Sequence, residues 1–179
     1  MKNITILTIT ICVLLVAGCT TTPATTILPG TVSPNHILPM NGTTVIGSGN
    51  NTIELSLDSI EVDPSTDVGN HTITIYVHAR NNGTTPRQFV WFSKLTNTYG
   101  NSFGGIGISH LGNGARSAKI YPGRGELPRD YIVIRSDESF ATLSKGAVLD
   151  VYIMEKTADE ISMVPDYHVA WTIDPGVIR

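Results

Sequence analysis

The sequence predicts an all-β chain that folds as a sandwich of about seven short strands. Apolar and polar residues alternate over several short stretches, which is the pattern of strands with one buried face. Turn-forming residues separate these stretches at short intervals. No helix-length stretch keeps a 3.6-residue apolar period, and residues 157–163 have room for one helical turn at most.

The first strand is expected at residues 53–62, where every second residue is apolar up to Leu57. The alternation resumes one residue out of phase at Ile60, which predicts a β-bulge near Ser59. Residues 63–70 are rich in Asp, Ser, Gly and Asn and predict a turn.

The clearest strand is expected at residues 72–81, with Ile75 on its apolar side and Tyr76 on the other. A third strand follows at residues 88–95, and residues 104–107 form a glycine-rich segment. Turns at Pro122-Gly123 and after residue 173 separate the later strands, which are expected at residues 119–121, 130–135, 148–153 and 168–173.

The third strand is apolar on both faces. Trp91 occupies the position where an immunoglobulin-type sandwich places its core tryptophan. If Phe89 and Trp91 point inward, Val90 and Phe92 point outward, although a sandwich buries only one face of each sheet. Either residues 106–111 or another loop cover the outer pair as a satellite cluster, or Val90 and Phe92 form an exposed surface for a partner.

Four segments carry a family resemblance: Val77-His78-Ala79-Arg80-Asn81-Asn82-Gly83, Tyr99-Gly100, Tyr121-Pro122-Gly123 and Asp130-Tyr131-Ile132-Val133-Ile134. In this order, residues 53–173 resemble the telokin-like immunoglobulin-fold domains of exported prokaryotic lipoproteins. The resemblance implies an immunoglobulin-like β-sandwich in an extracellular setting. It implies no catalytic residue, because that family is largely uncharacterised.

The N-terminus has the layout of a secretory signal peptide over residues 1–18: Lys2, an uncharged apolar run, and small residues before Cys19. Leu15-Val16-Ala17-Gly18-Cys19 resembles the lipobox of prokaryotic lipoproteins, which implies a lipid on the Cys19 thiol. The alternative is an uncleaved anchor, but residues 4–19 would make a helix of about 24 Å against a hydrocarbon core of roughly 30 Å.

Residues 19–51 are predicted to be a disordered stalk, because they are rich in Thr, Pro, Gly, Asn and Ser and carry no Asp, Glu, Lys or Arg. The domain then spans residues 52–179. Val45-Ile46 is the exception, since this apolar pair could instead add an edge strand to the domain. N-glycosylation sequons begin at four residues: Asn41, Asn50, Asn70 and Asn82.

The charge of the chain limits which partners can be expected, and its cysteine content limits which covalent links it can form. Without residues 1–18 the chain carries 11 cationic and 15 anionic side chains, which gives no electrostatic footprint for nucleic acid. Cys12 lies in the signal segment, so Cys19 is left alone and no disulfide forms within the domain. We expect a monomer that meets the membrane through its lipid.

The sequence offers no pattern typical of an enzyme or a metal site. Its five histidines fall at no ligand spacing. Glu61, Asp63 and Asp67 could hold Ca²⁺, but an Asx-type turn at Asp63 explains them better. The acidic pairs at residues 137–138 and 159–160 are interpreted as solvated loops.

These observations predict a non-catalytic module without cofactor, anchored on the extracellular face of the membrane, which binds an envelope protein or glycan or has a structural role there. The alternative is a small-solute sensor or accessory subunit of an envelope transporter or receptor, which would need an apolar pocket with converging polar groups.

Overall fold

The computed structural model describes residues 25–27, 36–64, 70–104, 116–155 and 164–179. One helix, α2 (Asp137–Leu143), accompanies the strands within these ranges. In chain order the strands are β1 (Thr25–Ile27), β2 (Ile37–Leu38), β3 (Thr43–Ser48), β4 (Asn51–Pro64), β5 (His71–Asn81), β6 (Arg87–Asn97), β7 (Ser102–Gly104), β8 (Arg116–Ile120), β9 (Gly125–Glu126), β10 (Arg129–Ile134), β11 (Ala147–Glu155) and β12 (Tyr167–Ile173).

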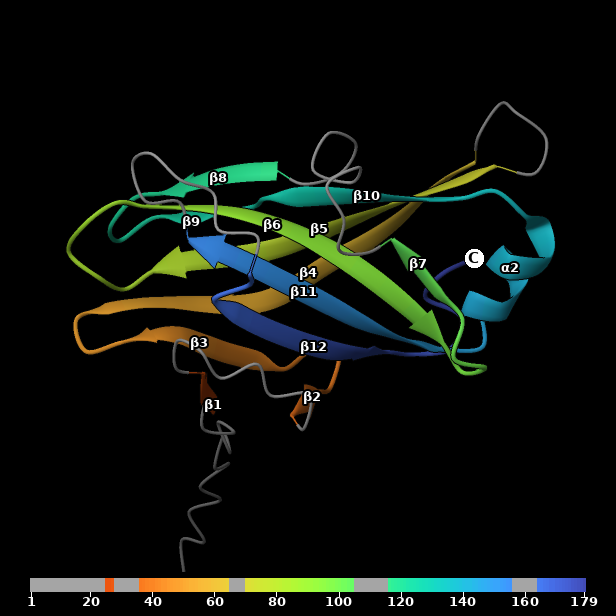
Figure 1. Cartoon of the computed structure of the whole chain (residues 1–179), viewed down its shortest axis with the longest axis horizontal. Helices are drawn as coiled ribbons and strands as arrows, with labels where there is room; N and C mark the ends of the chain where they lie inside the picture. Colours follow the sequence, from red (N-terminus) through yellow and green to blue (C-terminus); the bar gives the residue numbers. More distant parts are fainter. Residues whose placement is uncertain (1–24, 28–35, 65–69, 105–115, 156–163) are drawn as a thin grey trace, which may run out of the picture.

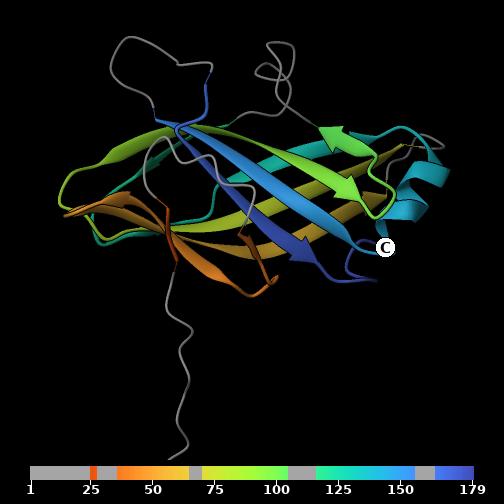
Figure 2. The ribbon, with the colours of Figure 1, turned by 60° about the horizontal axis from the view of Figure 1, so that its bottom comes forward.

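Within the described residues, the strands form two six-stranded sheets that pack face to face (Figures 1 and 2). The first sheet has the order β1-β3-β4-β5-β10, and β9 pairs with the same edge of β5 as β10. The second has the order β2-β12-β11-β6-β7, and β8 pairs with β6 beside β7. The predicted all-β sandwich is confirmed.

The central strands follow the immunoglobulin arrangement. The chain passes from β4 to its neighbour β5, crosses to β6 in the other sheet, and returns to β10 beside β5. It then crosses again to β11 beside β6, and continues to β12 beside β11. This order matches strands A, B and E in one sheet and C, F and G in the other. The connection between β10 and β11 contains α2.

The core lies between the sheets and follows the predicted alternation. On β5, the inward side chains are Ile73, Ile75, Val77 and Ala79, none more than 2% exposed. Trp91 is buried in the same core, as predicted for the third long strand. The pairing of β4 with β5 shifts register between Leu57 and Ser59, so the predicted β-bulge is also confirmed.

The predicted stalk over residues 19–51 is wrong for its last part, because residues 43–48 form a hairpin with β4. Ile46 is fully buried in the core, and Thr44 beside it is also buried. The Trp171 indole Nε1 donates a hydrogen bond to the Gly42 carbonyl at 2.9 Å, which ties the segment before the hairpin to β12. Burial of Ile46 and backbone pairing with β4 offset the cost of ordering this Thr- and Gly-rich stretch.

The prediction of a solvated loop at residues 137–138 is wrong, because this acidic pair forms the first turn of α2. The Ser136 hydroxyl accepts a hydrogen bond from the Ser139 N–H at 3.3 Å, which caps the helix. Asp137 and Glu138 favour this end because its unpaired N–H groups carry partial positive charge. The His71 ring stacks on Phe140 at 3.9 Å and contacts Asp137 at 2.8 Å, which fixes the helix against β5.

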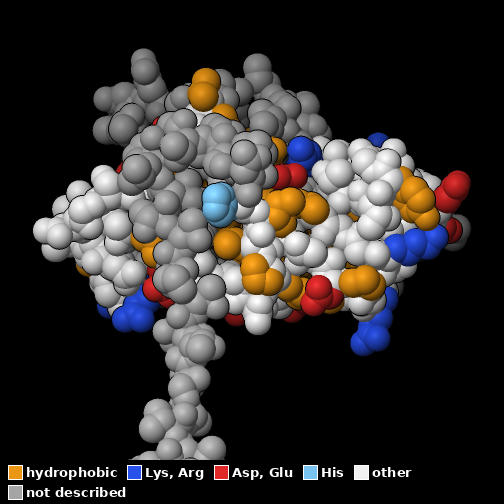
Figure 3. Space-filling view, turned by 90° about the horizontal axis from the view of Figure 1, so that it is seen from below, with side chains coloured by type: hydrophobic (Ala, Val, Ile, Leu, Met, Phe, Trp, Pro, Cys, Tyr) orange, Lys and Arg blue, Asp and Glu red, His pale blue; other side chains and the backbone are white. Residues whose placement is uncertain are grey.

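The two ends of the sandwich differ. The β3–β4 hairpin and the β5–β6 turn lie at one end, on the left in Figure 1, together with the end of β11 and the start of β12. Helix α2 and the C-terminus lie at the other end. Seen from the edge that carries β1 and β2, the described surface shows small groups of hydrophobic side chains between polar ones (Figure 3). We refer below to the end with the hairpin and the β5–β6 turn as the loop end.

Candidate functional site

Three polar side chains close the interior of the sandwich at its loop end. Arg87 begins β6, Glu155 ends β11 and Tyr167 begins β12. Each has the inward parity of its strand, so each lies at the end of that strand's row of inward-facing side chains. Arg87 is 9% exposed and Tyr167 is 2% exposed. The interior therefore ends in a polar layer.

Arg87 and Glu155 form a two-pronged ion pair. Arg87 Nε donates to Glu155 Oε1 at 2.8 Å, and Nη2 donates to Oε2 at 2.6 Å. Nη2 also donates to the Tyr167 hydroxyl at 3.4 Å, and the guanidinium lies 4.9 Å from the centre of the Phe89 ring. Burial acts to lower the pKa of Arg87, but its hydrogen bonds and the charge of Glu155 outweigh burial and raise it. The guanidinium stays charged, and its position is fixed.

The β3–β4 hairpin also contacts the Arg87 guanidinium. Arg87 Nη1 donates to the Asn51 carbonyl at 2.9 Å. The hairpin approaches this closely because residue 47 is a glycine with a φ of +96°. A Cβ at Gly47 would collide with the Asn51 carbonyl oxygen and would lie 2.9 Å from Arg87 Nη1. Gly47 is therefore part of the site through the space that it leaves open.

A buried asparagine shapes the β5–β6 turn. The Asn81 amide donates to the carbonyl oxygens of Thr85 at 2.8 Å and Ile120 at 3.0 Å, and its own oxygen accepts from the Gly83 N–H at 2.8 Å. These bonds replace the missing strand pairing in the turn. They hold Thr85 and Pro86 beside the start of β6.

A polar cleft of about 320 Å³ opens over these groups. Its walls are the β3–β4 hairpin, the β5–β6 turn and the Arg87–Glu155–Tyr167 group, with eight lining residues: Gly47, Ser48, Asn51, Thr85, Pro86, Arg87, Glu155 and Tyr167. We call this the Arg87 cleft. It lies at the end of the sandwich where immunoglobulin variable domains carry their binding loops, which is an analogy of fold alone.

A second polar cluster lies on the outer face of the sheet that contains β6, β11 and β12. His168 Nε2 contacts Asp150 Oδ1 at 2.7 Å, and Lys94 Nζ lies 3.6 Å from Asp150 Oδ2. The His168 ring stacks on Tyr152 at 4.4 Å. Burial acts to lower the pKa of Lys94, but Tyr152 and the charge of Asp150 outweigh it and raise it. Asp150 pairs with both His168 and Lys94, so we interpret the cluster as structural.

Val90 and Phe92 belong to the same outer face and are buried. They are 7% and 5% exposed and form a separate cluster with Tyr152 and Met154. Phe92 stacks on Tyr152 at 5.3 Å. The interpretation of Val90 and Phe92 as an exposed partner surface is therefore wrong, and the satellite-cluster interpretation fits the structure. Residues 106–111, suggested as its cover, lie outside the described residues.

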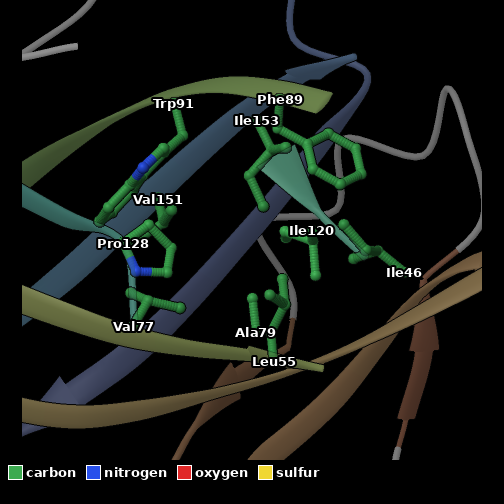
Figure 4. A pocket seen from close by; sticks show the side chains of 10 residues that line it. All are labelled: Ile46, Leu55, Val77, Ala79, Phe89, Trp91, Ile120, Pro128, Val151 and Ile153. Atoms are coloured by element: carbon green, nitrogen blue, oxygen red, sulfur yellow. The ribbon is translucent and has the colours of Figure 1, made fainter. Parts of the chain in front are cut away.

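The interior holds one further feature, a void of about 20 Å³ between the sheets (Figure 4). Its lining is apolar: Ile46, Leu55, Val77, Ala79, Phe89, Trp91, Ile120, Pro128, Val151 and Ile153. This volume is far below that of a small-molecule pocket. The buried Trp91 Nε1 has no hydrogen-bond partner in the part of the chain that the structure describes. The void is a packing gap and not the solute pocket that a sensor would require.

The remaining predicted sites are placed as follows. Cys19 and Asp67 lie outside the described residues. The sequon residues Asn41, Asn50 and Asn82 are exposed, whereas Asn70 is half-buried. Among the described residues, no three metal-ligating side chains of His, Cys, Asp or Glu gather. Glu61 instead accepts a hydrogen bond from the Tyr76 hydroxyl at 3.1 Å. Within the described ranges, no helix has the length and apolar character needed to cross a bilayer.

No protein-family model matches the chain, and no curated protein matches it in sequence. Among solved structures, it is similar to an uncharacterised β-sandwich protein of Clostridium difficile, with 10% identity and a TM-score of 0.45 over 79% of this chain and 97% of the other. A candidate lipoprotein of Bacillus subtilis gives 12% identity and a TM-score of 0.38 over 71% of this chain. Bacteroides uniformis β-glucuronidase 2 has 8% identity and a TM-score of 0.39 over 66% of this chain. This chain spans 37% of the Bacillus protein and 12% of the glucuronidase, and none of the three assigns it a function.

Proposed function

We propose that this chain is a non-catalytic binding module, tethered to the outer face of the cell membrane through a lipid on Cys19, and that its ligand occupies the Arg87 cleft. The observation that carries the binding role is the convergence of Arg87, Glu155 and Tyr167 beneath an open cleft. The pair joins a buried, fixed guanidinium to a Glu155 side chain that stays 35% exposed, and so presents oriented polar groups to a ligand.

The edge where the N-terminal segment joins the sandwich is compatible with a ligand in the Arg87 cleft. The described chain joins the sandwich at the edge that carries β1, β2 and β3, and β1 pairs in parallel with β3. The cleft lies at the loop end, where β3 turns into β4. A lipid on Cys19 would thus be attached through the segment that leads into one wall of the cleft.

Membrane fractionation tests the tether. Cys19→Ser should release the chain from the membrane fraction or leave its signal segment uncleaved, since a serine has no thiol to accept the lipid. If the variant is processed and remains as membrane-bound as the wild type, the lipid anchor is wrong.

Photo-crosslinking in intact cells tests the binding site. A photoreactive benzoylphenylalanine in place of the exposed Thr85, on the rim of the cleft, should form adducts with envelope material. The matched control replaces Thr98, an exposed threonine at the opposite end of the sandwich. Equal adduct formation from both positions, or none from Thr85, would exclude the cleft as the binding site.

A further inference from the structure

The hydrogen-bonding groups of the Arg87 cleft determine which ligand groups can bind there. The Glu155 carboxylate meets the guanidinium along one edge, and its remaining lone pairs are open to acceptance because the side chain is 35% exposed. The Tyr167 hydroxyl accepts from Arg87 Nη2, so its own proton remains to be donated. The floor of the cleft therefore offers a strong acceptor beside a donor.

The charges of the cleft disfavour ions. Arg87 and Glu155 contribute one positive and one negative charge to its lining, which sum to zero. An anion would have to compete with the Glu155 carboxylate for a guanidinium that is already engaged through Nε and both terminal nitrogens. A cation would have to compete with Arg87 for the carboxylate. A neutral ligand meets neither cost.

Hydroxyl groups fit this arrangement because each donates one hydrogen bond and accepts others. Two neighbouring hydroxyls of one sugar ring can donate to Glu155 and accept from Tyr167. Pro86 adds an apolar ring to the wall, against which the C–H face of a sugar can pack. The volume of about 320 Å³ lies at the lower end of small-molecule sites, which suits a short stretch of glycan.

We infer that the ligand of the Arg87 cleft is a neutral glycan, which the Glu155 carboxylate and the Tyr167 hydroxyl recognise through hydrogen bonds. This inference rests on the proposed function, because it names the class of ligand for the same cleft. Glu155 accepts hydroxyl protons of the sugar, Tyr167 donates to a sugar oxygen, and Arg87 holds both in place.

The test uses the full chain, purified in detergent and fluorescently labelled, on an array of neutral, sulfated and uronic-acid glycans. We expect binding to neutral glycans. Tyr167→Phe removes only the hydroxyl, whereas Glu155→Gln removes the charge and replaces one acceptor oxygen with an NH2 donor. Each should weaken binding by at least tenfold. Thr85→Trp fills the cleft from its exposed rim and should abolish binding without altering the ion pair. Thr98→Trp, its matched control at the far end, should bind as the wild type does.

Three outcomes would overturn the inference. The first is binding of the charged glycans alone. The second is binding of neutral glycans that Tyr167→Phe and Thr85→Trp leave unchanged. The third is an array without any bound glycan. If this third result accompanies adducts from position 85 in cells, the glycan class is wrong while the cleft remains the binding site. If position 85 gives no adducts either, the proposed function fails as well.

Discussion

The Asp130 carboxylate accepts a hydrogen bond from the Ser93 backbone N–H at 2.7 Å, which joins β10 of one sheet to β6 of the other. Ser93 lies in the gap between the part of β6 that pairs with β8 and the part that pairs with β7. Its N–H therefore receives a partner from the opposite sheet. The other carboxylate oxygen accepts from the Tyr131 N–H at 2.8 Å. A buried carboxylate thus closes a break in strand pairing.

Asp130→Asn should destabilise the domain by about 1.5–3 kcal/mol, the range for hydrogen bonds to a charged group. Both oxygens of Asp130 face backbone donors, whereas an asparagine has one oxygen and would turn its amide hydrogens toward one of them. Denaturant melts of the two proteins check this. The control, Asp58→Asn at an exposed position, should change stability by less than about 0.5 kcal/mol. Equal effects would mean that the link between the sheets adds nothing.

Ile46→Ala should cost about 2–5 kcal/mol, as for other fully buried aliphatic side chains. Val45→Ala should cost less, because Val45 lies on the other side of β3 and is only half-buried. Removal of residues 1–50 should likewise destabilise the domain strongly. If that truncated chain melts like the full chain, β3 is not part of the core.

Gly47→Ala should destabilise the chain more than Gly49→Ala, although both glycines have a positive φ in the same hairpin. At Gly49 no atom lies within 4 Å of the added methyl group, so only the backbone cost of about 1–2 kcal/mol applies. At Gly47 the methyl group also displaces Asn51 or Arg87. The nuclear magnetic resonance signal of the Arg87 Nε–H should move in the first variant alone. Identical melting and spectra for the two variants would contradict this account of the cleft.

Ser136→Ala should lower stability by about 1 kcal/mol through loss of the cap of α2. Ser144→Ala is the control, because the Ser144 hydroxyl donates to the Ala141 carbonyl at the exposed far end of the helix. Thermal melts of both variants measure the difference. A loss that is no larger for Ser136→Ala would show that the cap does not hold the helix.

Most of the fold could be predicted because the alternation of apolar and polar residues within one strand shows which of its side chains face the core. The alternation along β5 identifies its inward side chains without knowledge of its neighbours, and the phase change before Ile60 identifies the bulge. β3 could not be separated from a stalk in this way, since it is short and its order depends on burying Ile46 against the other strands. Helix α2 is similarly short, and contacts with His71 from β5 hold it in place.

The site was missed although part of its signal is present in the sequence. Arg87 has the parity of Phe89 and Trp91, so an inward-facing Trp91 already implies an inward-facing guanidinium. A buried charge requires a partner. That the partner is Glu155 follows only from the antiparallel pairing of β6 with β11, which brings the start of one strand to the end of the other. The contribution of Gly47 depends on backbone geometry that no pattern of side chains reveals.

The most direct test of the central claim, that the Arg87 cleft is the binding site, is a nuclear magnetic resonance titration. The isotope-labelled full chain in detergent would be mixed with solubilised envelope extract from the organism that encodes it. We predict that the signals that shift gather at Ser48, Thr85 and the Arg87 Nε–H, around the cleft. Shifts that gather instead around Tyr76 and Tyr131, on the outer face of the sheet that contains β5 and β10, would contradict the claim.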